Sequence, residues 1–311
     1  MEHDGTEMTV VRQQHFACEG PVEVCVELDA GRLDVRLVEP EESPAAADEV
    51  FVQIRPDPKG QPLWGAGIGG LLSWLGEQAG VGQPGDVAAE ATRNTVIDFT
   101  RQRLTVRTPR DAPFPTVAVT IEVSAPAGSS VLARSGSGDI TVDGVADRLD
   151  ATTGSGQVLA QRCTGAVDVR TGSGDVRLGS VQGTLRVRTG SGVVDVVALD
   201  GPAGAEGAST VQTGAGNVRF GAVGRDLTAH TGRGDLVVMD ASAGRLELTS
   251  GSGQLRIGIH GGVHAELDVS SGSGRARSEL PVTGPPAEAS VGLRVKARTG
   301  SGDALVTAAS R

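Results

Sequence analysis

The fold of this chain is decided by a stretch of eighteen residues, Gly172-Ser173-Gly174-Asp175-Val176-Arg177-Leu178-Gly179-Ser180-Val181-Gln182-Gly183-Thr184-Leu185-Arg186-Val187-Arg188-Thr189. It contains two runs in which apolar and polar residues alternate, and glycine-containing corners separate them. Such runs are typical of short β-strands. A Ser/Thr-Gly-x-Gly corner of the same kind occurs nine times between Ser135 and Asp303. Because a two-strand unit recurs at a nearly fixed period, the sequence predicts a stacked repeat architecture.

The period of the repeat is eighteen residues. Four of the eight steps between corners have this length and one has nineteen, while the steps of 24, 21 and 28 residues are interpreted as the same unit carrying a loop insertion. Aligning the units places aliphatic residues at fixed sites after each corner. The first column contains Ile140, Val158, Val176, Val194, Val218, Leu236 and Leu255, and the second contains Val142, Ala160, Leu178, Val196, Phe220, Val238 and Ile257. Both columns are predicted to face inward.

Two strands cannot bury an apolar face by themselves, so the units are expected to stack as parallel strands about 4.8 Å apart. The chain has 46 glycines but only two Trp, five Phe and no Tyr, which suits thin coils filled by aliphatic residues. The predicted fold is all-β: a single-chain parallel β-solenoid, β-helix-like, of about 18-residue coils over residues 127–306, with a tail at 307–311.

Each corner begins with a hydroxyl residue and a glycine. The hydroxyl column consists of Ser135, Thr153, Thr171, Thr189, Thr213, Thr231, Ser250, Ser271 and Thr299. Its members have inward parity, so we interpret the column as an internal hydrogen-bond ladder to turn amides or between hydroxyls. The glycines are expected because the chain reverses there, which needs either positive φ or a close backbone approach.

Residues 1–126 are predicted to form a β-rich N-terminal cap with early coils. Alternating segments at 22–37, 50–54, 96–106 and 116–123 indicate strands, and residues 86–93 carry a helical signal. We expect this region to cover the first edge of the solenoid, because an open edge invites other chains to pair with it.

A helical insertion near 61–93 departs from the repeat. Within Gln61 to Gly85, apolar residues fall at or near helical spacing, namely Trp64, Ile68, Leu71, Leu72, Trp74 and Leu75. These six residues are the candidate interaction element, which would dock on an unknown protein partner or on a membrane surface. The alternative is that the same stripe caps the open hydrophobic end of the solenoid.

Charge and targeting signals limit the possible functions. The formal net charge of -10 argues against nucleic-acid binding, because a phosphate-tracking surface is normally basic. No transmembrane segment and no secretory signal is recognised, so a cytoplasmic location is expected unless an atypical route exports the chain. Three cysteines make a poor disulfide framework, and Cys163 aligns with an apolar column, which predicts a core residue rather than a nucleophile.

No cofactor or metal site is predicted. The residue after each corner varies between Asp, Gln, Asn, Val and Arg, which does not suit a repeated calcium ligand. The Arg233-Gly234-Asp235 tripeptide coincides with a standard corner, and His260 with His264 has no nearby cysteine. A catalytic solenoid would need clustered carboxylates and basic groups on one face, for which Asp168, Asp195 and Arg186 are the candidates. Scattered surface charge explains these three equally well.

The sequence resembles a known group, the LiaG-like β-strand-repeat family of bacterial "putative adhesins", a domain-of-unknown-function family. The resemblance rests on the repeated Thr-Gly-Ser-Gly-Asp corners and on the segments 26–31, 86–93 and 295–300. It covers nearly the whole chain and implies a non-enzymatic β-solenoid with no family active site. The function expected is therefore an interaction scaffold of unknown partner, and the alternative is a solenoid enzyme acting on polysaccharide.

Overall fold

The structure of the chain is a computed structural model that describes residues 11–41, 48–57, 84–109, 117–201, 207–281 and 291–309. Strands dominate these residues, and they belong to two compact units, Met1–Gly144 and Val145–Arg311. In each unit two β-sheets enclose an apolar core. The predicted all-β solenoid is confirmed.

Unit 1 combines parallel and antiparallel pairing. One of its sheets has the order β1-β4-β7-β3-β9, and the other has the order β8-β2-β6-β5. The pairs β1–β4, β4–β7 and β5–β6 are antiparallel, whereas β3 and β2 pair with their neighbours in parallel. The strands are β1 Arg12–Ala17, β2 Glu23–Leu28, β3 Ala30–Val38, β4 Glu49–Pro56, β5 Val96–Thr100, β6 Arg103–Arg107, β7 Ala118–Pro126, β8 Ser130–Ser135 and β9 Asp139–Ala146.

The antiparallel strands of unit 1 bring β1 and β5 to the edges of its two sheets. Phe16 on β1 and Phe99 on β5 stack with ring centroids 5.3 Å apart, so an aromatic pair joins the two edges. Stacked aromatic pairs contribute roughly 0.5–1.5 kcal/mol beyond the area they bury. The aromatic pair therefore closes part of the core where the parallel coil pattern stops.

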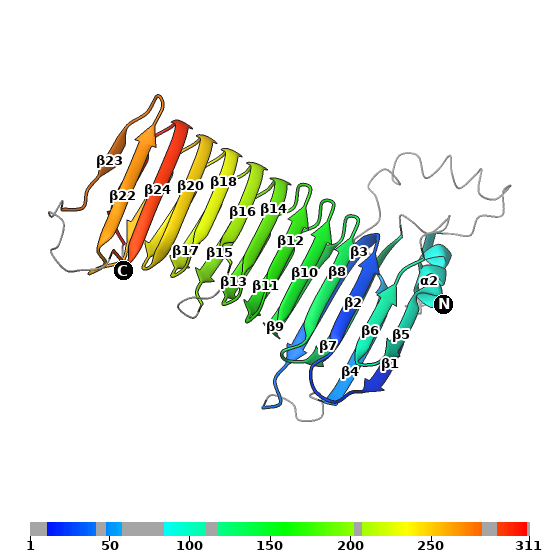
Figure 1. The fold of residues 1–311 in the computed structure, drawn as a ribbon. Helices are drawn as coiled ribbons and strands as arrows, with labels where there is room; N and C mark the ends of the chain where they lie inside the picture. The colour runs from blue at the N-terminus through cyan, green and yellow to red at the C-terminus, as the bar shows by residue number, and fades with distance from the viewer. Residues whose placement is uncertain are drawn as a thin grey trace, which may run out of the picture. The chain divides into compact units, whose positions relative to one another are not determined.

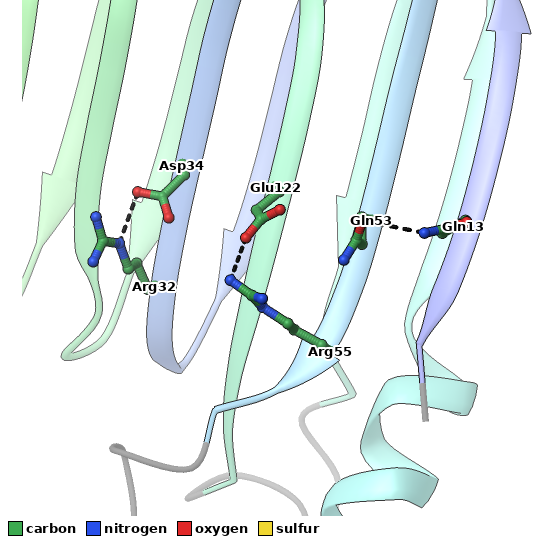
Figure 2. Close-up of polar contacts among 6 residues, drawn as sticks. All are labelled: Gln13, Arg32, Asp34, Gln53, Arg55 and Glu122. Carbon is green, nitrogen blue, oxygen red and sulfur yellow. Dashed lines mark hydrogen bonds and ion pairs between the residues drawn. The ribbon is translucent and has the colours of Figure 1, made fainter. Parts of the chain in front are cut away.

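On the outward face of the β1-β4-β7-β3 sheet, polar side chains contact one another, as Figure 2 shows. Gln13 donates from Nε2 to Oε1 of Gln53 at 3.2 Å across β1 and β4, and Arg55 pairs with Glu122 across β4 and β7. On β3, Arg32 Nε lies 2.7 Å from Asp34 Oδ1. Exposed ion pairs stabilise by about 0–1 kcal/mol each, so these contacts add little to the stability of unit 1.

Helix α2, Pro84–Asn94, lies where the sequence carries its helical signal. It packs on β4 and β7, and Ala91 and Thr92 are buried in that contact. The Thr95 hydroxyl donates to Ala91 O at 2.9 Å at the end of the helix, and Arg12 Nη1 donates to Arg93 O at 3.0 Å. The last turn of α2 is thus tied to strand β1.

Unit 2 is a regular stack of two-strand coils. The even-numbered strands form one sheet, in the order β10-β12-β14-β16-β18-β20-β24-β22, and the odd-numbered strands form the other, in the order β11-β13-β15-β17-β19-β21-β25-β23. The strands are β10 Arg148–Thr153, β11 Val158–Cys163, β12 Val167–Thr171, β13 Val176–Val181, β14 Leu185–Ser191, β15 Val194–Leu199, β16 Ser209–Ala215, β17 Val218–Val223, β18 Leu227–Arg233, β19 Leu236–Ala241, β20 Gly244–Ser252, β21 Leu255–Ile259, β22 Ala265–Ser271, β23 Ala276–Ser278, β24 Leu293–Ser301 and β25 Ala304–Ala308.

The register of the parallel pairs reproduces the columns read from the sequence. Val176 lies opposite Val158 in one direction and Val194 in the other, and all three side chains are buried. Leu185 lies opposite Val167 in the even-numbered sheet. From β11 to β19 the columns continue from coil to coil in register, whereas the β19–β21 pair has a register shift between Val238 and Ala241.

The stacking order departs from the order of the chain at the last two coils. Strand β24 pairs with β20 on one side and with β22 on the other, so the final coil in sequence lies between its two predecessors (Figure 1). We expected successive coils to stack in sequence. The inward apolar residues of β24 and β22 are of the same three types, Leu, Val and Ala, but those of β24 are buried whereas Leu267 and Val269 of β22 stay half-buried at the sheet edge. The two coils differ on the other sheet, where the buried Val306 of β25 lies opposite the polar Ser278 of β23. The more apolar coil thus gains two neighbours.

The hydroxyl column forms the predicted ladder at most of its positions, with bonds to the backbone, although the buried Thr213 hydroxyl has no partner among the described residues. Thr153 Oγ1 and Thr171 Oγ1 accept from the amides of Gly156 and Gly174 at 3.0 and 2.9 Å. In a second arrangement, Thr231 Oγ1 donates at 3.0 Å to the carbonyl of a glycine in the preceding coil. The ladder therefore satisfies corner amides and ties neighbouring coils together.

Candidate functional site

A shallow groove of about 680 Å³ runs along unit 2 beside the corners that follow the even-numbered strands. We call it the corner groove. One wall is an outward column with one residue on each of five successive strands, β10 to β18: Thr152, Arg170, Arg188, Gln212 and His230. These residues are register partners of one another, so they form a straight row across the sheet.

The floor of the corner groove is made of corner residues without side chains. The first corner glycines Gly172, Gly190, Gly214 and Gly232 line it, next to the threonines of the hydroxyl ladder. These glycines are required by stacking: a Cβ on Gly172 would lie 2.4 Å from the carbonyl oxygen of Gly154 in the preceding coil. The groove is therefore open because the coils pack so closely that no side chain fits at this position.

The electrostatics of the corner groove contrast with the acidic chain. None of the groove-lining residues carries a carboxylate. Arg170 Nη2 lies 2.8 Å from Asp168 Oδ2, on the same strand but outside the lining. Arg188, the register partner of Arg170, is exposed and forms no ion pair or hydrogen bond with any residue that the structure describes. Two register-paired arginines thus line the groove, and of the two only Arg170 has a carboxylate contact among the described residues.

The basic residues that are close in sequence divide between two faces. Arg170, Arg186 and Arg188 belong to even-numbered strands, whereas Arg177 lies on β13 of the other sheet, where its Nη2 is 3.1 Å from Asp175 Oδ2. Arg177 follows a corner and therefore lies on an odd-numbered strand, whereas the other three arginines precede a corner and lie on even-numbered strands. Gln212 and His230, which the sequence analysis did not select, complete the row because they stand directly before the hydroxyl of the corner.

The candidate catalytic trio is not brought together. Asp168 and Arg186 are register partners on β12 and β14, with Arg186 Nη1 4.0 Å from Asp168 Oδ2. Asp195 lies on β15 in the odd-numbered sheet, where it is the register partner of Arg177. The hypothesis that the three residues share one face is wrong, because the outward faces of the two sheets lie on opposite sides of the core.

The candidate interaction element lies outside the described residues. Trp64, Ile68, Leu71, Leu72, Trp74 and Leu75 all belong to the undescribed range 58–83. Its role as a docking element or an end cap stays a prediction. No helix among the described residues has both the length and the apolar character needed to span a membrane.

Cys163 is a core residue, as predicted. It is the last residue of β11, and its buried side chain lies opposite Val181 of the next coil. Burial raises the pKa of the Cys163 thiol to about 12. The thiolate is the nucleophilic form of cysteine, so this residue is inert at neutral pH.

The side chains after the corners have a structural role that the sequence analysis missed. Asp175 Oδ1 accepts from the Val193 amide at 2.9 Å, and Asp235 Oδ1 accepts from the Gln254 amide at 2.8 Å, in each case from the next coil. The tripeptide ending at Asp235 is therefore a standard corner, in which Gly234 takes a φ of 136°. These carboxylates are occupied by backbone amides instead of being arranged around a cation.

The histidine pair gives no metal site. His260 Nδ1 lies 2.9 Å from Asp240 Oδ2, and His264 is exposed. In the parts of the chain that the structure describes, no three His, Cys, Asp or Glu side chains gather closely enough to hold a metal ion.

Calcium is expected to leave the thermal stability unchanged. The corner carboxylates already accept backbone hydrogen bonds, and Val193 and Arg275 interrupt their column, so no repeated set of oxygen ligands exists. Thermal unfolding of metal-free protein followed by circular dichroism, with and without low-millimolar calcium, checks this expectation. A saturable rise in Tm that magnesium does not reproduce would show that the corners bind calcium after all.

Part of the chain matches a protein-family model. Residues 99–220 match the family described as Toastrack DUF4097, a domain of unknown function. The family expected from the sequence therefore fits, while the LiaG-like name is not confirmed. Comparison with curated proteins gives no match.

Comparison with solved structures returns long alignments at low identity and low TM-score. A "putative adhesin" from Bacteroides fragilis is 11% identical over 96% of both chains, with a TM-score of 0.35. A "putative adhesin" from Parabacteroides distasonis is 9% identical over 96% of both chains, with a TM-score of 0.32. A "putative lipid binding protein" from Parabacteroides distasonis is 8% identical over 96% of this chain and 95% of its own, with a TM-score of 0.35.

Proposed function

We propose that this chain, which carries a Toastrack DUF4097 domain over residues 99–220, is a non-enzymatic interaction scaffold that holds its partner in the corner groove. The observation that supports this most directly is the row from Thr152 to His230. It presents hydroxyl, guanidinium, amide and imidazole groups from five successive strands, and no carboxylate lines the groove beside it. Such a row binds, but it contains no nucleophile paired with a base.

The rigidity of the sheet favours binding by this row. Strands β12, β14 and β16 are hydrogen-bonded on both sides, so the backbone positions of Arg170, Arg188 and Gln212 are fixed before any partner arrives. A site on paired strands loses less conformational entropy on binding than a site on a loop. A regular column of side chains is therefore a preorganised surface.

The alternative, a solenoid enzyme acting on polysaccharide, has less support. Glycoside hydrolysis needs two carboxyl groups on opposite sides of one glycosidic bond. Asp168 and Asp195, the carboxylates selected for that role, lie on different sheets. The segment Gln61 to Gly85 stays a second candidate docking surface, through Trp64 and Trp74.

The experiment that tests the scaffold is affinity capture from the cells that make the chain. The groove variant is Arg170→Glu with Arg188→Glu, and the matched control is Arg177→Glu with Arg219→Glu, which reverses two outward arginines of the odd-numbered sheet. We expect a molecule enriched by the wild-type chain to be lost by the groove variant, because its charge is reversed at two adjacent contacts. The control should retain it.

The outcome also separates the two candidate surfaces. If the groove variant retains the captured molecule, the corner groove is not the binding surface. If deletion of residues 61–85 then removes the molecule while the folded β signal persists, docking belongs to that segment. If the control loses the molecule as completely as the groove variant, the loss reflects the change in overall charge, and the corner groove is not a specific binding site.

A further inference from the structure

The spacing of the row constrains the ligand of the corner groove, and this inference rests on the proposed function. Neighbouring strands of a sheet lie about 4.8 Å apart, so the five residues from Thr152 to His230 span about 19 Å. The groove crosses the strands instead of following one of them. A ligand that contacts the whole row must be extended and linear, with groups repeating at a spacing close to one sugar unit.

The two arginines define the charge of the ligand. Arg170 and Arg188 are direct register partners, and like charges opposite each other on a sheet destabilise it. Asp168 contacts Arg170 at 2.8 Å, but Arg188 has no partner among the described residues. A carboxylate placed between the two guanidinium groups would accept paired, charge-assisted hydrogen bonds from both. The ligand is therefore an anion at this point of its length.

The remaining members of the row suit a hydroxyl-rich neutral neighbour of that anion. Thr152 offers a hydroxyl, Gln212 an amide that both donates and accepts, and His230 a ring nitrogen. No residue that lines the groove is apolar and large. The row thus offers one cationic pair that can bind an anionic group, and neutral hydrogen-bonding side chains flank this pair on both sides.

Three other ligand classes fit the groove less well. Single-stranded nucleic acid binds by stacking bases on aromatic rings, and the lining has no Phe, Trp or Tyr. A membrane would need exposed apolar side chains, which the lining also lacks. An extended peptide adds to a free sheet edge, whereas β12, β14 and β16 already have partners on both sides.

We propose that the corner groove binds a linear acidic polysaccharide, with one uronate carboxylate held between Arg170 and Arg188 and sugar hydroxyls hydrogen-bonded by Gln212 and His230. The corner glycines allow the sugar chain to approach, because no side chain rises from the floor beside the row.

The test measures binding of polygalacturonate to the full chain by titration calorimetry, with fully methyl-esterified polygalacturonate as the matched neutral polymer. We expect saturable binding of the acidic polymer that weakens with salt, and binding of the ester at least about tenfold weaker, because a neutral ester cannot bridge two guanidinium groups. Arg188→Gln should weaken binding of the acidic polymer by about tenfold or more. Arg219→Gln, on the odd-numbered sheet, should not change it.

Several results would overturn this proposal. One is the absence of saturable binding, and another is equal affinity for the acidic and esterified polymers. A third is tighter binding of single-stranded DNA or of phosphatidylglycerol vesicles, run as parallel titrations, which would assign the row to a nucleic acid or a lipid surface. If polygalacturonate fails but the cellular capture still depends on Arg170 and Arg188, the glycan is rejected and the scaffold stands. If both fail, the groove has no binding role.

Discussion

Val176→Asp is expected to abolish soluble, folded protein, whereas Arg177→Asp should leave the fold intact. Val176 is fully buried and lies between Val158 and Val194 of the neighbouring coils. A carboxylate there has no partner, and burying an unpaired charge costs several kcal/mol. Because each coil depends on its neighbours, one broken layer interrupts the stack on both sides.

Arg177 is one residue away and gives the matched comparison. Its side chain is exposed and pairs with Asp175, and such surface pairs are worth about 0–1 kcal/mol. Soluble yield, the β signal in circular dichroism and the melting temperature of both variants measure the difference. Similar behaviour of the two variants, whether both fold or both fail, would show that the inward and outward positions of β13 are assigned incorrectly.

The period of the sequence was sufficient to predict the coil and its register. Period-two alternation placed Val158, Val176 and Val194 in one inward column, and parallel pairing brings the same three residues into line. The prediction succeeded because each coil buries only a few side chains, so any slip by one residue would turn all of them to solvent. The hydroxyl ladder followed from the same parity.

The order of the last two coils could not be predicted from the period. Both coils carry the same corner, at Gly272 and at Gly300, so both fit the corner position on the preceding coil. Which of the two coils lies at the edge depends on which would leave more apolar surface exposed there. Leu293 and Val295 are buried inside the stack, while Leu267 remains partly exposed. That comparison requires the burial of every coil in three dimensions.

Arg225 illustrates a second limit of sequence reasoning. It occupies a corner position at which earlier coils have Gly165 and Gly183, and a surface arginine would be the natural expectation. Its guanidinium is instead buried and donates to the carbonyl oxygens of Gln182 and Gly207 at 3.0 and 3.1 Å. The loop carbonyls that it satisfies belong to other coils, so no local pattern reveals them.

The candidate site was only partly visible in the sequence. Arg170, Arg177 and Arg188 are close together in the sequence, but Arg177 lies on the opposite sheet from the other two. The position of each residue relative to its corner carries the missing information, because residues directly before the corner hydroxyl share one outward column. The groove itself depends on the empty space over the corner glycines. The sequence shows that glycine occupies these positions, but only the structure shows that they lie side by side and form a groove.

Gly174→Ala is expected to lower stability strongly although it adds a single methyl group. A Cβ on Gly174 would lie 1.8 Å from the carbonyl oxygen of Gly156 in the preceding coil, a separation that atoms cannot adopt. The carbonyl is held by the stack, so relief requires local separation of two coils. Overpacking of this kind costs about 3 kcal/mol, which should lower the melting temperature by on the order of 5–10 °C.

Gly261→Ala is the control for this prediction, because a Cβ there meets no atom within 4 Å. It should change stability by less than about 0.5 kcal/mol, as surface substitutions usually do. Thermal unfolding followed by circular dichroism compares the two variants at equal protein concentration. A Gly174→Ala protein that melts together with Gly261→Ala would mean that the coils can separate at the corner without loss. Close stacking would then not explain why glycine occupies the corners, and the open floor of the groove would need another cause.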